Sequence, residues 1–258
     1  MKQKTFEYSD PLNDDFAETN IKTVLTPADY EYIPRSVVFK VCSWIVYRLI
    51  ARPLTYVYIK VAYHHKFVGR RAVRSVRGGS FFFGNHTLYA GDAFIPNHIS
   101  IRKNHIVSGP DATSIKGIKT LVKMLGAVPV PSSVQGGMKY ISAVNELIEK
   151  GRTVTIYPES HIWPYYTGIR PFGSSPFSIA ASSGAPCFSF TNVYFKSRLP
   201  FIKRPVVKTY INGPFYPDMT LPKRERTEKL RDEIYDSMVR EAGKQEQYVT
   251  YIYKKKED

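Results

Sequence analysis

From about residue 80 onward, the chain alternates between short apolar runs and longer segments in which apolar residues recur at helical spacing. The short runs are rich in aromatic or β-branched residues and predict strands at 81–83, 105–108, 127–130, 153–157, 187–190 and 206–211. The longer segments predict helices at 115–125, 138–150 and 221–242. Gly126 and Gly151 follow the first two segments, at the position where helices commonly end. This alternation indicates an α/β fold.

The first 62 residues have a different pattern. Residues 1–34 are polar and punctuated by prolines, which predicts an extended lead-in. Residues 36–61 are strongly apolar but interrupted by basic residues, and they predict one or two amphipathic helices broken near Pro53. We therefore divide the chain into 1–62, an N-terminal extension with an amphipathic helical membrane-docking lobe, and a main domain at 63–258.

The apolar N-terminal segment is too often interrupted to cross a membrane. A spanning helix needs about 20 mostly apolar residues, and the longest uncharged run here, Val41–Tyr47, is far shorter. A basic, aromatic and apolar helix of this kind can lie in the plane of a membrane interface. It can equally pack on its own domain, and the pattern leaves both interpretations open.

The chain of 258 residues has a formal net charge of +15, which favours anionic partners. Nucleic acid, anionic lipid headgroups and phosphorylated ligands all meet that description. Because no basic and aromatic motif of a known nucleic-acid module is present, we expect no nucleic-acid partner.

The two cysteines, Cys42 and Cys187, lie in apolar runs without the spacing of a zinc site or a disulfide framework, so they fit a reducing compartment. Residues 1–16 contain no apolar core of a signal peptide. We therefore expect an intracellular protein.

The candidate chemistry begins at Asn85-His86, which follow the apolar run FFFG, with Asp92 six positions after the histidine. Polar groups at the carboxyl end of a strand are a common place for a site in α/β proteins. A histidine can accept a proton near neutral pH, and a nearby carboxylate can fix its tautomer and stabilise the imidazolium. The pair is therefore a candidate for proton transfer, and a hydrogen-bonded structural histidine is the alternative.

A second polar group follows the strand predicted at 153–157, where Pro158 and Glu159 lead into the aromatic turn SHIWPYYTGIRPF. The alternative for Glu159 is a solvated loop carboxylate or a helix cap. The aromatic residues Trp163, Tyr165 and Tyr166 fit either an apolar, membrane-facing rim or plain packing.

Four blocks in order, across residues 80–190, resemble the PlsC-like glycerolipid acyltransferase family. They are the Asn85-His86 pair with Asp92, the segment GAVPVP at 126–131, the triplet YPE at 157–159, and the stretch RPFGSSPFSIAASSGAPCFSF at 170–190. The resemblance implies a central mixed, largely parallel sheet flanked by helices, with an N-terminal amphipathic helical lobe, and it makes 63–258 the acyltransferase domain.

The resemblance also implies a role for each residue of the first block. The reaction would move a fatty acyl group from an acyl thioester, either acyl-CoA or acyl carrier protein, to a lipid hydroxyl, as in phospholipid biosynthesis. His86 would be the general base and Asp92 would orient and stabilise it. Backbone amides or Asn85 would stabilise the developing oxyanion. No cofactor or metal is implied; the acyl thioester is a co-substrate.

For the substrates, the resemblance places Glu159 beside the acceptor, with Pro158 shaping the turn. The candidates for contacts with anionic groups of acceptor or donor are Arg170, Lys116 and Lys119. The implied partners are the thioester donor, a lipid acceptor and an anionic membrane surface, with an acyl carrier protein as one form of the donor. The implied location is the cytoplasmic face of a membrane, peripheral or monotopic.

The chain departs from the family pattern at three places. Five residues separate His86 from Asp92 instead of four, and on a regular helix this would turn the two side chains apart by roughly 120°. We expect an irregularity at Ala90-Gly91 to restore the contact. The second block ends in Pro131 rather than an arginine, and the third reads PESHIW rather than PEGTR. Both changes remove expected phosphate contacts, which leaves Arg170 or His161 to replace them or an acceptor without a phosphate.

Three other functions remain open at this point. The first is a non-catalytic membrane or lipid-binding protein of the same fold, and the second is acylation of an amine or of a lipid that lacks phosphate. The third is a metal site formed by His86, Asp92 and His98, although the spacing of these residues matches no known set of metal ligands.

Overall fold

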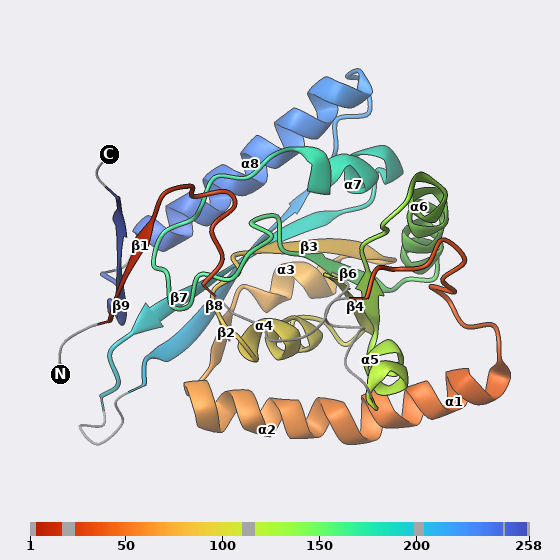
Figure 1. Cartoon of the computed structure of the whole chain (residues 1–258), viewed down its shortest axis with the longest axis horizontal. Helices are drawn as coiled ribbons and strands as arrows, with labels where there is room; N and C mark the ends of the chain where they lie inside the picture. The colour runs from red at the N-terminus through yellow and green to blue at the C-terminus, as the bar shows by residue number, and fades with distance from the viewer. Residues whose placement is uncertain (1–3, 17–23, 110–116, 199–203, 245, 257–258) are drawn as a thin grey trace.

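The computed structural model describes residues 4–16, 24–109, 117–198, 204–244 and 246–256, and its centre is a seven-stranded sheet (Figure 1). The strand order is β2-β8-β7-β3-β6-β4-β5. The strands are β2 (Lys66–Val68), β3 (Ser80–Gly84), β4 (Asn104–Ser108), β5 (Ala127–Pro129), β6 (Thr153–Ile156), β7 (Cys187–Phe195) and β8 (Val206–Phe215). Neighbouring strands run parallel except β7 and β8, so the predicted mixed, largely parallel sheet is confirmed.

Helices cover both faces of the sheet (Figure 1). On one face lie α6 (Val134–Glu149), α7 (Ser178–Ser183) and α8 (Lys223–Gly243), and on the other lie α3 (Arg70–Ser75) and α4 (Gly91–Phe94) with the N-terminal helices and α5 (Lys119–Leu125). Strand β3 shows why its run of phenylalanines is uninterrupted: Phe81 and Phe83 pack in the core under α6, α7 and α8, while Phe82 packs in the core on the opposite face. A strand buried on both faces needs apolar residues at every position.

The N-terminal apolar segment forms one continuous helical rod along the lower edge of the molecule (Figure 1). It consists of α1 (Val37–Ile45), the π-helical turn η1 (Val46–Ala51) and α2 (Arg52–Tyr63). The predicted break near Pro53 is wrong. Pro53 lies in the first turn of α2, directly after the π-helical turn, and proline is tolerated in a first turn although it has no N–H to donate.

This rod has a packed side and an exposed side. Ser43, Tyr47, Ile59 and Tyr63 are buried, so one side packs on the domain. On the exposed side lie Val37, Val38, Val41, Trp44, Ile45, Leu49, Ile50, Leu54, Val57 and Val61. Among the helices of the described residues, none combines the length and the apolar character required to cross a bilayer. The division of the chain at residue 62 stays a prediction.

The two ends of the chain pair with each other. Strand β1 (Lys4–Tyr8) runs parallel to β9 (Tyr251–Lys255), forming a separate two-stranded sheet. Trp163 is 1% exposed and its ring stacks on that of Tyr253 at 4.9 Å between centroids. Its indole N–H donates to the carbonyl of Asp14. The lead-in thus covers the loop after β6, and Trp163 is a packing residue rather than part of an exposed rim.

Candidate active site

The candidate site lies at the carboxyl ends of two neighbouring parallel strands. Asn85 and His86 directly follow β3, and Tyr157 to Glu159 follow β6. The pairing of Phe83 with Ile156 brings the two loops to the same edge of the sheet. This is the position at which open α/β sheets bind their ligands.

His86 and Asp92 are in contact. His86 Nδ1 lies 2.8 Å from Asp92 Oδ2, and the Leu88 N–H donates to the same oxygen at 2.9 Å. The contact is possible because residues 85–88 are not helical and α4 starts only at Gly91, so the helical-wheel angle does not apply. Gly91 is required for space, not for an unusual φ: an added Cβ would lie 2.8 Å from the Leu88 side chain.

The surroundings of Asp92 fix the orientation of the His86 ring. Asp92 is 2% exposed, and burial raises the pKa of its carboxyl while the hydrogen bond with His86 opposes that rise. The carboxylate also accepts from the Asn192 side-chain amide at 3.3 Å. Because the carboxylate accepts from His86, the ring proton lies on Nδ1, and Nε2 carries the free lone pair. Within the described residues, no protein group bonds to Nε2, and the side chain is 18% exposed.

Tyr157 holds the ring from its flat side. Its ring stacks on the His86 ring at 4.4 Å between centroids and 17° between planes. Its hydroxyl donates to the backbone carbonyl of Asp92 at 2.7 Å. One side chain therefore contacts both the His86 ring and the backbone of Asp92. The sequence analysis gave Tyr157 no role of its own, although it directly precedes the Pro158-Glu159 pair.

Asn85 and Asn192 join the loop after β3 to β7. Asn85 is 1% exposed; its Oδ1 accepts from the Asn192 N–H at 2.8 Å and its Nδ2 donates to the Asn192 carbonyl at 3.1 Å. The side chain is occupied in this way, so its placement gives no support to the predicted oxyanion contact.

A buried polar chain extends from Asp92 to His65. Asn192 Oδ1 accepts from the Thr209 hydroxyl at 2.6 Å, and that hydroxyl lies 2.7 Å from His65 Nε2. Since the Thr209 proton points to Asn192, His65 Nε2 must be the donor. Sequence reasoning missed all three residues, because they lie inside strands or next to a helix end and two of their contacts join segments 100 and 144 residues apart.

The buried histidines make stability depend on pH. Burial lowers the pKa of His65 to about 3 and that of His98 to about 4. Both stay neutral in the folded protein while the unfolded chain takes up protons below about pH 6.5. Stability is therefore lost as the pH falls from 6.5. At pH 5 we expect roughly 2 kcal/mol of lost unfolding free energy per histidine. Urea unfolding at pH 7 and pH 5 measures this.

The matched variants are His65→Gln and His98→Gln. Each should reduce the loss between the two pH values by roughly 2 kcal/mol, since glutamine does not titrate. Comparing a variant with itself at two pH values separates titration from lost contacts. An unchanged loss in both variants would contradict the assignment.

Glu159 is buried rather than solvated. It is 3% exposed; its Oε2 accepts from the His86 N–H at 3.1 Å and its Oε1 accepts from the Arg170 N–H at 3.1 Å. Burial raises its pKa and the Arg170 charge opposes that rise. Glu159 thus holds the backbone of His86 through the hydrogen bond to its N–H. Its carboxylate is enclosed, so the solvated-loop alternative is wrong and a direct contact with the acceptor finds no support in this placement.

Arg170 is equally enclosed, at 1% exposure. Its guanidinium lies 3.6 Å from Glu159 Oε2, donates to the carbonyls of Glu159, His161 and Pro11, and lies over the Trp163 ring. Burial lowers its pKa, and the Glu159 carboxylate opposes that decrease. The predicted contact with an anionic substrate group is not supported, because the guanidinium is buried and already bonds to carbonyls of the loop after β6 and of the lead-in.

The remaining predicted residues are dispersed. Pro158 is buried in the turn after β6. His161 lies at the surface with Nδ1 3.4 Å from Asp15 Oδ2. Lys119 is exposed at the start of α5, and Lys116 lies outside the described residues.

The metal alternative lacks a third ligand. His98 Nε2 bonds to the Thr55 hydroxyl at 3.0 Å rather than joining His86 and Asp92. In the part of the chain that the structure describes, no three His, Cys, Asp or Glu side chains are arranged to hold a metal ion.

A model of the acyltransferase family matches residues 44–192, more than half of the 258 residues, so the chain belongs to this family. The fold is similar to that of PlsC, the 1-acyl-sn-glycerophosphate (LPA) acyltransferase from Thermotoga maritima. That structure is 12% identical, with a TM-score of 0.53, over 83% of this chain and 98% of the other. No curated protein matches the sequence. The predicted PlsC-like family is confirmed.

Proposed function

We propose that the protein transfers a fatty acyl group from an acyl thioester, acyl-CoA or acyl carrier protein, to a hydroxyl of a lysophospholipid or similar lipid acceptor. The observation that carries the proposal is the His86–Asp92 pair, with Nδ1 bound to a buried carboxylate and Nε2 free. The family membership and the similarity to a lysophosphatidic acid acyltransferase support the same reaction class.

The chemistry follows from the protonation of this pair. His86 Nε2 takes the proton of the acceptor hydroxyl as its oxygen attacks the thioester carbonyl carbon. The Asp92 carboxylate stabilises the imidazolium through the Nδ1–H bond. The tetrahedral intermediate then collapses, the carbon–sulfur bond breaks, and the leaving thiolate takes the proton from Nε2. Ester and free thiol are the products.

An apolar cavity lined in part by α4 suits the acyl chain. Its volume is about 300 Å³, and it lies between the N-terminal rod, α4, α5 and the strands β4 and β5. Ala93 and Phe94, which directly follow Asp92, belong to its lining together with Val122, Leu125 and Ile106. Apolar walls favour burial of a hydrocarbon chain at about 0.8 kcal/mol per CH₂.

The acceptor's phosphate site differs from the family pattern. The segment after β5 has no arginine, and Thr26 of the lead-in bonds to the Val130 carbonyl at 2.8 Å and to Ser132 at 3.1 Å. With Arg170 buried as well, a phosphate would be bound by other groups, which is why the acceptor is stated as a lysophospholipid or similar lipid.

The test is an assay with purified protein. Mixed acceptors with and without a phosphate are offered together with acyl-CoA and acyl carrier protein donors, and the lipids are analysed by mass spectrometry. We expect acylated lipid and free thiol in equal amounts. Binding of lipids without any acylated product would instead support a non-catalytic lipid-binding protein.

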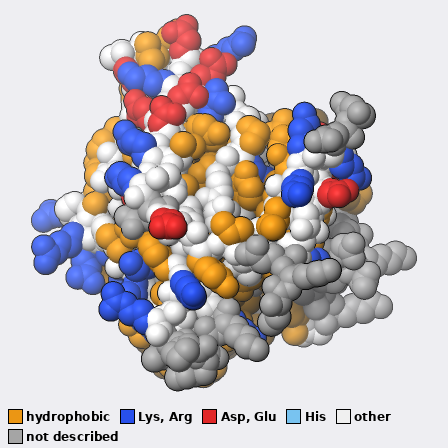
Figure 2. Space-filling view, turned by 90° about the vertical axis from the view of Figure 1, so that its left-hand side faces the viewer, with side chains coloured by type: hydrophobic (Ala, Val, Ile, Leu, Met, Phe, Trp, Pro, Cys, Tyr) orange, Lys and Arg blue, Asp and Glu red, His pale blue; other side chains and the backbone are white. Residues whose placement is uncertain are grey.

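We further propose that the exposed apolar side of the rod docks on an anionic membrane surface. Val41, Leu49 and Val57 are 53%, 60% and 59% exposed on three successive parts of the rod. Figure 2 shows Lys and Arg side chains gathered at the lower left of the side that carries the chain ends, while Asp and Glu concentrate at the upper end. Apolar residues flanked by positive charge suit an interface rich in anionic lipid.

Charged substitutions on the rod test the docking. The triple variant Val41→Glu, Leu49→Glu, Val57→Glu should bind vesicles of phosphatidylglycerol and phosphatidylcholine at least about 10-fold more weakly in cosedimentation, since each side chain contributes roughly 1.5 kcal/mol or more on burial. The matched control places the same charges at the exposed positions Val134, Met138 and Tyr216. Equal weakening in both variants would mean that only net charge matters.

A further inference from the structure

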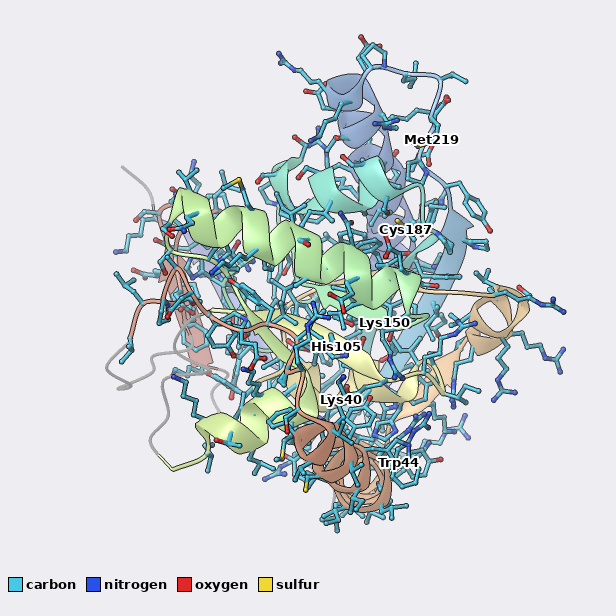
Figure 3. The ribbon with its side chains drawn as sticks, turned by 90° about the vertical axis from the view of Figure 1, so that its right-hand side faces the viewer. Lys40, Trp44, His105, Lys150, Cys187 and Met219 are labelled. Carbon is cyan, nitrogen blue, oxygen red and sulfur yellow. The ribbon has the colours of Figure 1, made fainter. Side chains whose placement is uncertain are left out.

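A second cavity lies at the opposite edge of the sheet from His86. It has a volume of about 560 Å³ and is lined by α1, residues 32–34, the end of α6 and the amino ends of β4, β5 and β6. Figure 3 shows Lys40, His105 and Lys150 in the region between α6 and α1, with Trp44 on α1 below them. Tyr47 and Ala127 line both this cavity and the apolar one, but none of the residues that line it belongs to the pair at His86.

The lining of this cavity is strongly basic. In the described part of the chain it contains no Asp or Glu and six Lys or Arg, namely Lys40, Arg48, Lys103, Lys123, Lys150 and Arg152. Two of them are neutralised from outside the cavity, because Lys123 pairs with Glu31 and Lys150 with Glu146. Of the described carboxylates, none forms an ion pair with Lys40, Arg48, Lys103 or Arg152.

Lys103 marks the inner end of the basic group. Its Nζ donates to the Ser43 hydroxyl at 2.7 Å and to the Met124 carbonyl at 2.8 Å, and it lies 5.2 Å from the centre of the Tyr47 ring. Burial, together with the charge of Arg152, lowers the pKa of Lys103 to about 8. Glu146 acts on Lys40 beyond ion-pair distance. The four cations without an ion pair still repel one another, so a bound anion would stabilise this arrangement.

The cavity is continuous with the exposed apolar side of the rod. Val41 and Trp44 line it, and they are also 53% and 57% exposed. A ligand with its charge among the basic residues would therefore have apolar surface available for a hydrocarbon chain along α1. Charge at one end and apolar surface at the other are the features of a membrane lipid with a phosphate headgroup.

We propose that this cavity binds the phosphate headgroup of an anionic phospholipid at a site separate from the acyl-transfer centre. The choice of a lipid over a free phosphate rests on the proposed membrane docking of the rod, while the anion site itself rests on the four unpaired cations. Bound in this way, the lipid would hold α1 against the amino edge of the sheet.

Short-chain lipids test the site without a membrane. Dihexanoyl phosphatidylglycerol, kept below its micelle concentration, is titrated into the full-length protein in a calorimeter and followed by tryptophan fluorescence. We expect saturable binding. Dihexanoyl phosphatidylcholine, which has the same chains and no net charge, should bind at least about 10-fold more weakly, as should inorganic phosphate, which lacks the chains.

The decisive variant is Lys40→Gln, Arg48→Gln, Arg152→Gln, and it should weaken binding of the anionic lipid at least about 10-fold. The matched control removes the same charge at the exposed Lys139, Lys223 and Lys254, and should bind as the unaltered protein does. His86→Ala should also bind normally, so the result does not depend on catalysis. Equal binding by the two triple variants, or equal affinity for the neutral lipid, would overturn the site. Inorganic phosphate that binds as tightly and blocks the lipid would overturn the lipid assignment.

Discussion

The His86→Ala protein should remain folded and lose acyl transfer by about 10²-fold to 10⁴-fold, the usual contribution of a general base. The imidazole is the group with a free nitrogen at this strand end, and Asp92, Glu159 and Tyr157 all serve to hold it or its backbone. The measurement is the initial rate of thiol release with a saturating lipid acceptor. Unfolding by urea shows whether the fold persists.

Asp92→Asn separates the charge of the carboxylate from its shape. The substitution keeps the side-chain volume but removes the negative charge that stabilises the imidazolium, so the rate should fall while the affinity for the acceptor changes little. His161→Ala is the control, since His161 is a surface histidine paired with Asp15. Normal thiol release by His86→Ala would show that another group accepts the proton.

Much of the sheet could be predicted because its strands are buried on both faces. The apolar runs at 81–83 and 153–157 needed no partner to be recognised, and they became β3 and β6 within a residue at each end. The helix predicted at 138–150 begins at Val134 instead, because Ser133 caps it through the Gly136 N–H. Because Ser133 lies before the first residue of the apolar periodicity, the periodicity does not show where the helix begins.

The pairing of the chain ends could not be predicted. Strand β1 is short and polar on one side, and its partner β9 lies more than 240 residues away. The local sequence of either end is therefore compatible with an extended coil, and aromatic packing between distant residues, including Phe6, Trp163 and Tyr253, stabilises the strand pair. Contacts of this range are not contained in local periodicity.

The candidate site was predicted in part. The contact between His86 and Asp92 followed from the family pattern, but the expected unusual backbone at Gly91 is wrong: the contact arises because residues 85–88 are not helical. The burial of Glu159 and Arg170 did not, because it depends on the lead-in: the Pro11 carbonyl bonds to Arg170, and the Asp14 carbonyl bonds to Trp163 beside it. Two charged residues eleven positions apart look like surface residues until a distant segment covers them.

Arg170→Met should be the most destabilising substitution near the site. Methionine fills much of the same volume but leaves the Glu159 carboxylate buried without its cation, and breaking a buried ion pair from one side costs about 3–5 kcal/mol. Urea unfolding at pH 7 measures the loss. Arg224→Met is the matched control, since Arg224 is 89% exposed and pairs with Glu228 on the surface, where such pairs contribute little.

The double variant Arg170→Met, Glu159→Gln distinguishes an orphaned charge from a lost packing contact. If the cost arises from the unpaired carboxylate, neutralising Glu159 should recover part of the stability lost in Arg170→Met, so the two changes will not be additive. Additive losses would mean that Arg170 acts mainly through its bonds to the carbonyls of Pro11 and His161.

The same double variant keeps a hydrogen-bond acceptor for the His86 N–H, because the glutamine amide oxygen can replace Glu159 Oε2. The double variant should therefore retain more acyl-transfer activity than Glu159→Ala. An equal loss of activity in the two variants would show that the negative charge of Glu159 is required in addition to its hydrogen bond to His86.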